Sequence, residues 1–207
     1  MNTSKVAAKY NSPLRAGQAH ATAEAILRAV RTILEKDPDS ALGFDEVAVA
    51  AGVNRRTIFR HFPTKEALLR AFWTSTNATL GVPVWPESEA DLTRLPPELF
   101  AALERIEGVV RAAHTSSTGR EFRMQANEEC LRAFRSSLAD VSRDLDPRTA
   151  RHLAALVQLL FSATAWLTMR DYWGFGGREA GEAAAWGIGA LLAAARAEAA
   201  AARKRRR

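Results

Sequence analysis

The chain has 207 residues, one cysteine (Cys130) and a formal net charge of +6. A single cysteine excludes an internal disulfide framework and a thiol metal cluster, and it is typical of a reducing compartment, so we expect a cytoplasmic protein. The first 25 residues contain no apolar h-region and therefore predict no secretory signal. Abundant Ala, Leu, Arg and Glu, with almost no β-branched runs, predict an all-α fold.

Much of the positive charge lies at the two ends of the chain. Residues 203–207 are all basic, and without them the net charge falls to +1. Residues 1–20 contain three basic residues and no acidic one, together with Pro13 and Gly17, and we expect them to form a flexible arm. Basic ends suit a polyanion such as DNA, although solubility alone would also explain the C-terminal tail.

Residues 21–80 show the pattern of a small helical domain. Apolar residues from Ile26 to Leu34 recur with a helical period, and Asp37-Pro38 ends that helix. Two short helices are predicted over 44–50 and 54–61, with Ala51-Gly52-Val53 between them. Thr64 is then expected to cap a longer helix, because its hydroxyl can accept a hydrogen bond from a free backbone amide.

A second domain is predicted over residues 81–207. It opens with a linker, 81–97, that contains four prolines and several acidic residues. Beyond the linker, apolar residues recur with a helical period in four stretches, near 98–114, 120–142, 147–173 and 178–202. The pattern predicts a helical bundle behind a three-helix N-terminal unit.

Two segments of this second domain carry no charged side chain, 153–169 and 183–195. The first is at the short limit of a membrane span, roughly 17–25 residues, and contains polar residues, so we expect no membrane partner. Helices that are apolar on all sides need cover on all sides. We therefore expect the outer faces of the last two helices to pair with a second copy of the chain in a homodimer, the alternative being that these helices form only the core of one chain.

The segment Gly43–Phe62 has the spacing of a DNA-binding helix-turn-helix. Such a unit needs a small residue where its helices cross, a glycine in the turn, and apolar residues behind the second helix. Ala48 and Gly52 meet the first two requirements, and the apolar positions are Val47, Val53 and Ile58. Short helical hairpins in ordinary bundles share part of this spacing. The surface of the second helix therefore decides between a DNA-binding unit and an ordinary hairpin.

That surface is basic, and no acidic residue occurs from Val53 to Lys65. A surface without acids suits contact with phosphates. The candidate DNA-binding residues are Asn54, Arg55, Arg56, Thr57, Phe59, Arg60, His61 and Lys65. Two of them have a plainer interpretation: His61 as a solvated histidine, and Arg60 as a solvent-facing residue or a partner of Glu66.

The run from Phe44 to Arg70 resembles the N-terminal domain of the tetracycline-repressor (TetR) family, and the likeness is close over residues 20–75. It implies a homodimer that binds a palindromic operator in double-stranded DNA. It also implies a ligand pocket inside each helical body and release from DNA when the ligand binds. Beyond residue 75 only the helix pattern is similar.

The resemblance also implies roles for single residues. Thr57, His61 and Lys65 match positions that contact phosphates in the family. Phe59 stands where tyrosine is usual, so a hydroxyl contact gives way to an apolar one, for example with a thymine methyl. Arg56 replaces a frequent glycine, and its side chain, like that of Arg55, has the length and charge to reach a guanine edge.

The effector site is the least defined part of the sequence. We expect a small hydrophobic or aromatic effector, and the candidate lining residues are Trp73, Phe100, Leu103, Phe122, Met124, Phe134, Trp166 and Met169. Aromatic residues at helical spacing are more often plain core. No metal or cofactor motif is present, because the four histidines are scattered. Two alternatives stay open: an all-α enzyme or small-molecule-binding protein with its site in the C-terminal bundle, and a non-specific architectural DNA binder.

Overall fold

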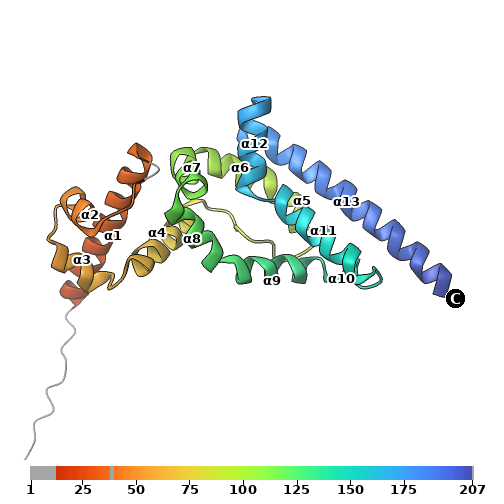
Figure 1. Ribbon diagram of the computed structural model, residues 1–207, viewed down its shortest axis with the longest axis horizontal. Helices are drawn as coiled ribbons and strands as arrows, with labels where there is room; N and C mark the ends of the chain where they lie inside the picture. The colour runs from red at the N-terminus through yellow and green to blue at the C-terminus, as the bar shows by residue number, and fades with distance from the viewer. Residues whose placement is uncertain (1–12, 38–39, 207) are drawn as a thin grey trace, which may run out of the picture.

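The computed structural model describes residues 13–37 and 40–206, and every regular element in these ranges is an α-helix (Figure 1). The all-α prediction is therefore confirmed. In chain order the helices are α1 (Pro13–Lys36), α2 (Phe44–Ala51), α3 (Arg55–His61), α4 (Lys65–Thr79), α5 (Asp91–Arg94), α6 (Pro96–Glu104), α7 (Glu107–Thr115), α8 (Ser117–Gln125), α9 (Asn127–Ser137), α10 (Ala139–Ser142), α11 (Pro147–Leu160), α12 (Ala163–Trp173) and α13 (Gly177–Arg206).

The expected arm over residues 1–20 is wrong for its second half. Residues 13–20 form the first two turns of α1, and residues 1–12 lie outside the described residues. Proline is tolerated in the first turn of a helix, where its missing N–H has no partner to lose, so Pro13 begins the helix instead of preventing it. Gly17 lowers helix propensity but does not break the helix.

The described residues form two hydrophobic cores. The N-terminal core is formed by the four helices α1, α2, α3 and α4, and its buried members include Ile26, Val30, Val47, Ile58 and Leu68. Helix α7, which lies beyond the expected domain boundary at residue 81, adds Val109, Ala112 and Ala113 to the same core. Residues 81–90 of the expected linker separate α4 from α5 along the chain, and the rest of it forms α5 and the start of α6. Helix α7 returns to pack on the N-terminal helices (Figure 1).

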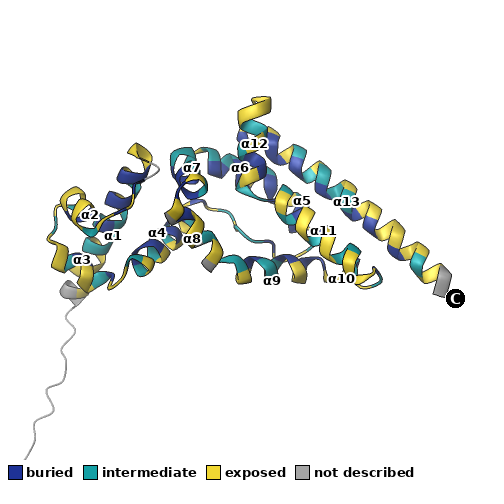
Figure 2. Cartoon of the chain, viewed as in Figure 1, coloured by how far each residue is buried: buried dark blue, intermediate teal, exposed yellow. Residues whose placement is uncertain are grey.

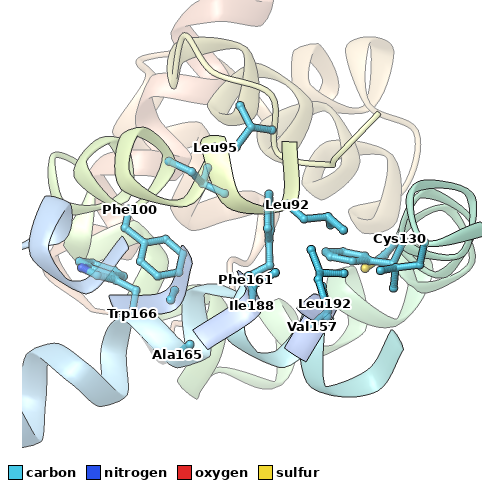
Figure 3. Close-up of a cluster of buried hydrophobic side chains, with 14 of the residues drawn as sticks. Leu92, Leu95, Phe100, Cys130, Val157, Phe161, Ala165, Trp166, Ile188 and Leu192 are labelled. Atoms are coloured by element: carbon cyan, nitrogen blue, oxygen red, sulfur yellow. The ribbon is translucent and has the colours of Figure 1, made fainter. Parts of the chain in front are cut away.

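The body core lies among α5, α6, α9, α11, α12 and α13 (Figure 3). Phe100, Trp166 and Ile188 are fully buried there. Helices α6 and α13 pack closely because glycines face the contact. A Cβ built on Gly181 would lie only 2.4 Å from the Pro96 carbonyl oxygen, so no larger residue fits without a shift of the backbone.

The prediction of four helical stretches in the body is partly wrong, because each of the first three is divided into shorter helices. The clearest break lies between α11 and α12, where the Ser162 hydroxyl accepts a hydrogen bond from the backbone N–H of Ala165 and caps α12. A serine cap satisfies a backbone amide that an uninterrupted helix would bond internally. The last stretch, by contrast, is one continuous helix of 30 residues.

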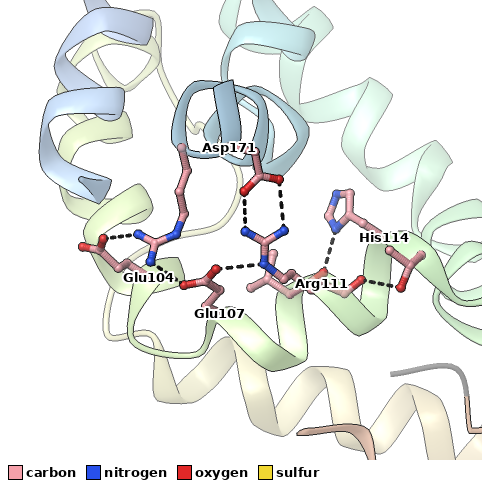
Figure 4. A network of polar contacts seen from close by, with 8 residues as sticks. Glu104, Glu107, Arg111, His114 and Asp171 are labelled. Atoms are coloured by element: carbon pink, nitrogen blue, oxygen red, sulfur yellow. Dashed lines mark hydrogen bonds and ion pairs between the residues drawn. The ribbon is translucent and has the colours of Figure 1, made fainter. Parts of the chain in front are cut away.

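Helix α7 connects the two cores. One side packs in the N-terminal core, and the other carries ion pairs to α12 (Figure 4). Arg111 bonds Glu107 at 2.8 Å and also pairs with both carboxylate oxygens of Asp171. Arg170 joins Glu107 at 2.7 Å and Glu104 at 2.6 Å. The hydrogen bonds that Asp171 accepts from Arg111 hold the pKa of Asp171 below its usual value.

Two sequence expectations concern the surface of the body. No single helix in the described ranges has both the length and the hydropathy of a membrane span; α11 and α12 reach them only together, across a bend of 57°. The basic tail forms the end of α13, and Arg203 pairs with Asp144. Arg207 lies outside the described residues. Figure 1 places this end of the molecule opposite α3, far from the helix-turn-helix of the same chain.

Candidate nucleic-acid interface

Helices α2 and α3 form the turn that the sequence predicts. Gly52 has φ +65°, the left-handed conformation that glycine adopts at little cost, and its N–H bonds the Val49 carbonyl at 3.2 Å. Ala48 and Val47 are buried behind the turn. At the start of α2, Gly43 supplies no side-chain hydrogen bond to the helix, as expected for a weak cap.

Both helices after the turn have a side-chain cap, and the cap predicted at Thr64 is confirmed. The Asn54 side chain accepts from the Thr57 N–H at 2.8 Å, and the Thr64 hydroxyl accepts from the Ala67 N–H at 3.2 Å. Ile58 anchors α3 from behind with no exposed surface. The short α3 is thereby fixed at its start and along one side, which leaves its other side for a ligand.

The outer side of α3 is cationic and exposed. Arg55, Arg56 and Arg60 are all exposed, and Phe59 exposes 41% of its surface beside them. Arg55 is not free: its Nη1 bonds Asp45 of α2 at 2.8 Å. In the described part of the chain Arg60 forms no ion pair with Glu66, and its side chain faces solvent.

The three residues expected to contact phosphates are less exposed. Thr57, His61 and Lys65 are all half-buried. The Thr57 hydroxyl donates to Asn54 at 2.9 Å. The Nε2 of His61 is buried and has no hydrogen-bond partner among the described residues, so a phosphate contact by this nitrogen needs a different side-chain rotamer. Lys65 begins α4, where the positive end of the helix dipole adds to its charge.

The structure does not bring the expected effector-binding residues around one cavity. Trp73 belongs to the N-terminal core, whereas Phe100, Leu103 and Trp166 are packed in the body core. Met124 is 66% exposed. Met169 is half-buried against the body core, Phe134 is buried within it, and the side chain of Phe122 lies outside the described residues.

A cavity of about 620 Å³ lies instead between α9, α10 and α11. Of the expected lining residues, Phe134 lies in the wall of this cavity. Alanines and leucines make up half of its lining residues, and Arg135 and Arg151 add two cations with no acidic residue in the lining. The full lining is Leu131, Phe134, Arg135, Leu138, Ser142, Ala150, Arg151, Ala154, Ala155 and Gln158.

Sequence reasoning missed three parts of these sites. Asp45 was not recognised as a partner of Arg55, because ten residues and a turn separate them and no local periodicity links the two. The walls of the cavity come from three helices and share no motif. The contact of α7 with the N-terminal core was also missed, although its closely spaced apolar residues Val109, Ala112 and Ala113 were a usable signal.

Comparison with known proteins agrees with this geometry. Residues 26–72 match the model of the family described as bacterial regulatory proteins, tetR family. The HTH-type transcriptional repressor LfrR of Mycolicibacterium smegmatis (strain ATCC 700084 / mc(2)155) is 41% identical over 58 residues. That match covers 28% of this chain and 30% of LfrR, so most of either protein lies outside it. The likeness to the tetR family of bacterial regulatory proteins therefore lies in the N-terminal helices of this chain.

Proposed function

We propose that the protein is a sequence-specific transcriptional regulator that binds double-stranded DNA with α3 in the major groove. The observation that carries the proposal is the outer side of α3, where Arg55, Arg56 and Arg60 are exposed on a helix fixed from behind by Ile58. A helix of this kind fits the major groove, and its cations neutralise phosphates and reach base edges. The tetR-family match of residues 26–72 supports the same activity.

Different residues of the interface have different tasks. Arg55 and Arg56 lie in the first turn of α3, the part of a recognition helix that points at base edges, and we assign them to sequence reading. Thr57, His61 and Lys65 position the helix on phosphates. Phe59 has no hydroxyl group, so its contact with the DNA is apolar only.

A homodimer is the second part of the proposal. Helices α11 and α13 expose the apolar side chains of Leu156 (46%), Leu159 (51%) and Trp186 (80%). Exposed residues occur along both helices (Figure 2). Exposed apolar side chains on adjacent helices favour contact with another chain. A two-fold axis through this face would present two α3 helices to one duplex, and the operator would then be palindromic.

The third part is a response to a small hydrophobic or aromatic effector. The cavity between α9, α10 and α11 has the volume for such a ligand, and Arg135 and Arg151 favour one that carries an anionic group. Helix α11 shares the body core with α12, and the ion pairs of α12 reach α7, which packs in the N-terminal core. Binding in the cavity would thus act on the DNA-binding helices through these contacts, and the result is release of DNA.

Selection of bound duplexes from a random pool by the full-length protein tests the first two parts. We expect a palindromic site with half-sites one helical turn apart. Enrichment of no motif would contradict sequence specificity and favour an architectural DNA binder. Absence of any binding would contradict the proposal as a whole.

Titration with naphthoate, an aromatic anion, tests the third part. We expect Arg151→Gln to weaken binding of naphthoate, whereas Arg148→Gln, on α11 but outside the cavity lining, leaves it unchanged. Equal binding by both variants would remove this cavity as the effector site. The same titration repeated with the selected duplex shows whether the ligand releases DNA.

A further inference from the structure

The side chain of Arg55 contacts two residues of the α2–α3 unit, and a third residue supports one of these two. Its Nη1 bonds the Asp45 carboxylate at 2.8 Å, and its guanidinium carbon lies 5.4 Å from the centre of the Phe59 ring. Phe59 in turn meets Phe44 edge to face, with 4.7 Å between ring centres. Asp45 and Phe44 come from the first turn of α2, so two helices fix one exposed arginine.

This arrangement does little for the stability of the fold. The two charged side chains are 57% and 74% exposed, and exposed ion pairs stabilise proteins by only about 0–1 kcal/mol. What the contacts change is the freedom of Arg55. A long exposed side chain samples many rotamers, and ordering it on binding opposes association unless it is already ordered.

The contacts also leave the useful part of Arg55 available. A guanidinium group has five N–H donors in one plane, and the ion pair with Asp45 engages Nη1 alone. Bidentate recognition of guanine O6 and N7 needs two parallel donors, which remain on the other edge of the group. The Phe59 ring fixes the plane of those donors by a cation–π contact.

We infer that Asp45 is a positioning residue for DNA sequence recognition: with Phe59 and Phe44 behind it, it orients Arg55 to read a guanine in each half-site. The inference rests on the proposed function. It gives the phenylalanine at position 59 a role of its own, since its ring supports the arginine, and it makes Arg55 the more rigid of the two arginines in the first turn of α3.

The test compares full-length variants on duplexes selected by the wild type. Arg55→Ala first identifies the base pair that Arg55 reads. Asp45→Ala should then lower the preference for guanine at that same base pair by about 3- to 10-fold, the scale expected for loss of an ordered side chain. Its affinity for a shuffled duplex should not fall. Glu46→Ala is the matched control, because Glu46 has the same charge in the same helical turn but bonds Ser40 instead.

Three further results decide the inference. Asp45→Ala added to Arg55→Ala should change base preference no further, and Phe59→Leu should lower preference at the same base pair. If Asp45→Ala leaves the preference for guanine unchanged, the inference is overturned. If Asp45→Ala increases that preference, the inference is also overturned, because Asp45 would then mask Arg55. If Arg55→Ala alters no base preference, the inference fails while sequence-specific binding by the wild type still stands, so the two claims fail separately.

Discussion

The α2–α3 unit and the body differ in how their important residues are distributed along the chain. The DNA-facing residues all lie between positions 44 and 65, and their side chains are largely exposed. The body core draws on helices from α5 to α13, and its members are buried. Substitutions on α3 should therefore change DNA binding and leave folding nearly intact, whereas substitutions in the body should act first on stability.

The largest expected effect is in the body. Gly181→Ala should destabilise the protein by roughly 3 kcal/mol or more, because the added methyl group meets the backbone of α6. Gly189→Ala on the same helix is the control: its Cβ has space, and alanine is the better helix former, so a gain of about 0.5–1 kcal/mol is expected. Urea denaturation measures both. Equal effects at the two positions would contradict close packing at Gly181.

The matching change on the DNA-binding side is Arg56→Ala. It should relax sequence preference at one base step of each half-site, at a cost of about 1–3 kcal/mol in binding, and should leave the unfolding midpoint nearly unchanged. Binding to selected and substituted duplexes measures the first effect, and urea denaturation the second. A large loss of stability would break the contrast between the two regions.

Asp91 tests whether the linker between the two regions is held by local contacts. Its carboxylate accepts hydrogen bonds from the Glu87 and Ser88 amides and pairs with Arg94. Asp91→Ala should cost about 1–2 kcal/mol of stability, because it leaves those donors without a partner. Asp140→Ala removes an exposed pair with Arg143 and should cost about 1 kcal/mol or less. The same denaturation series compares them.

Lys65→Ala separates phosphate contact from base reading. It should weaken binding evenly across duplex sequences and lower the slope of log affinity against log salt by about 1. Fluorescence anisotropy at several salt concentrations measures the slope. A change of preference at one base pair, with the slope intact, would instead make Lys65 a base-reading residue.

The smallest expected effect is a pH dependence of stability that arises from α7, the helix that connects the two cores. Burial lowers the pKa of His114 on α7, and Arg123 adds to the shift. As the pH drops through 6.5, the histidine in the unfolded chain gains a proton before the one in the folded protein does, so stability should fall over that range. Urea denaturation of wild type and His114→Gln at about pH 7.5 and about pH 5.5 checks this. A loss of the same size in the variant would contradict the assignment.

The contrast also explains what the sequence predicts well. Gly52, Asn54 and Thr64 act through hydrogen bonds to backbone groups at most four positions away, so their roles are readable from spacing. The pairing of Asp45 with Arg55 depends on the angle between two helices, which spacing does not contain. The division of the 147–173 stretch cannot be read from the sequence, because a serine such as Ser162 has the same polarity in the middle of a helix as at a cap.

The central claim is sequence-specific binding through α3, and one measurement tests it most directly. The dissociation constant of the full-length protein is measured for the selected duplex and for a shuffled duplex of the same composition, at one salt concentration. The account predicts that the selected duplex binds at least about 1,000-fold more tightly. It also predicts that Arg55→Ala combined with Arg56→Ala removes most of that ratio. Equal affinity for the two duplexes in the wild type would contradict the account.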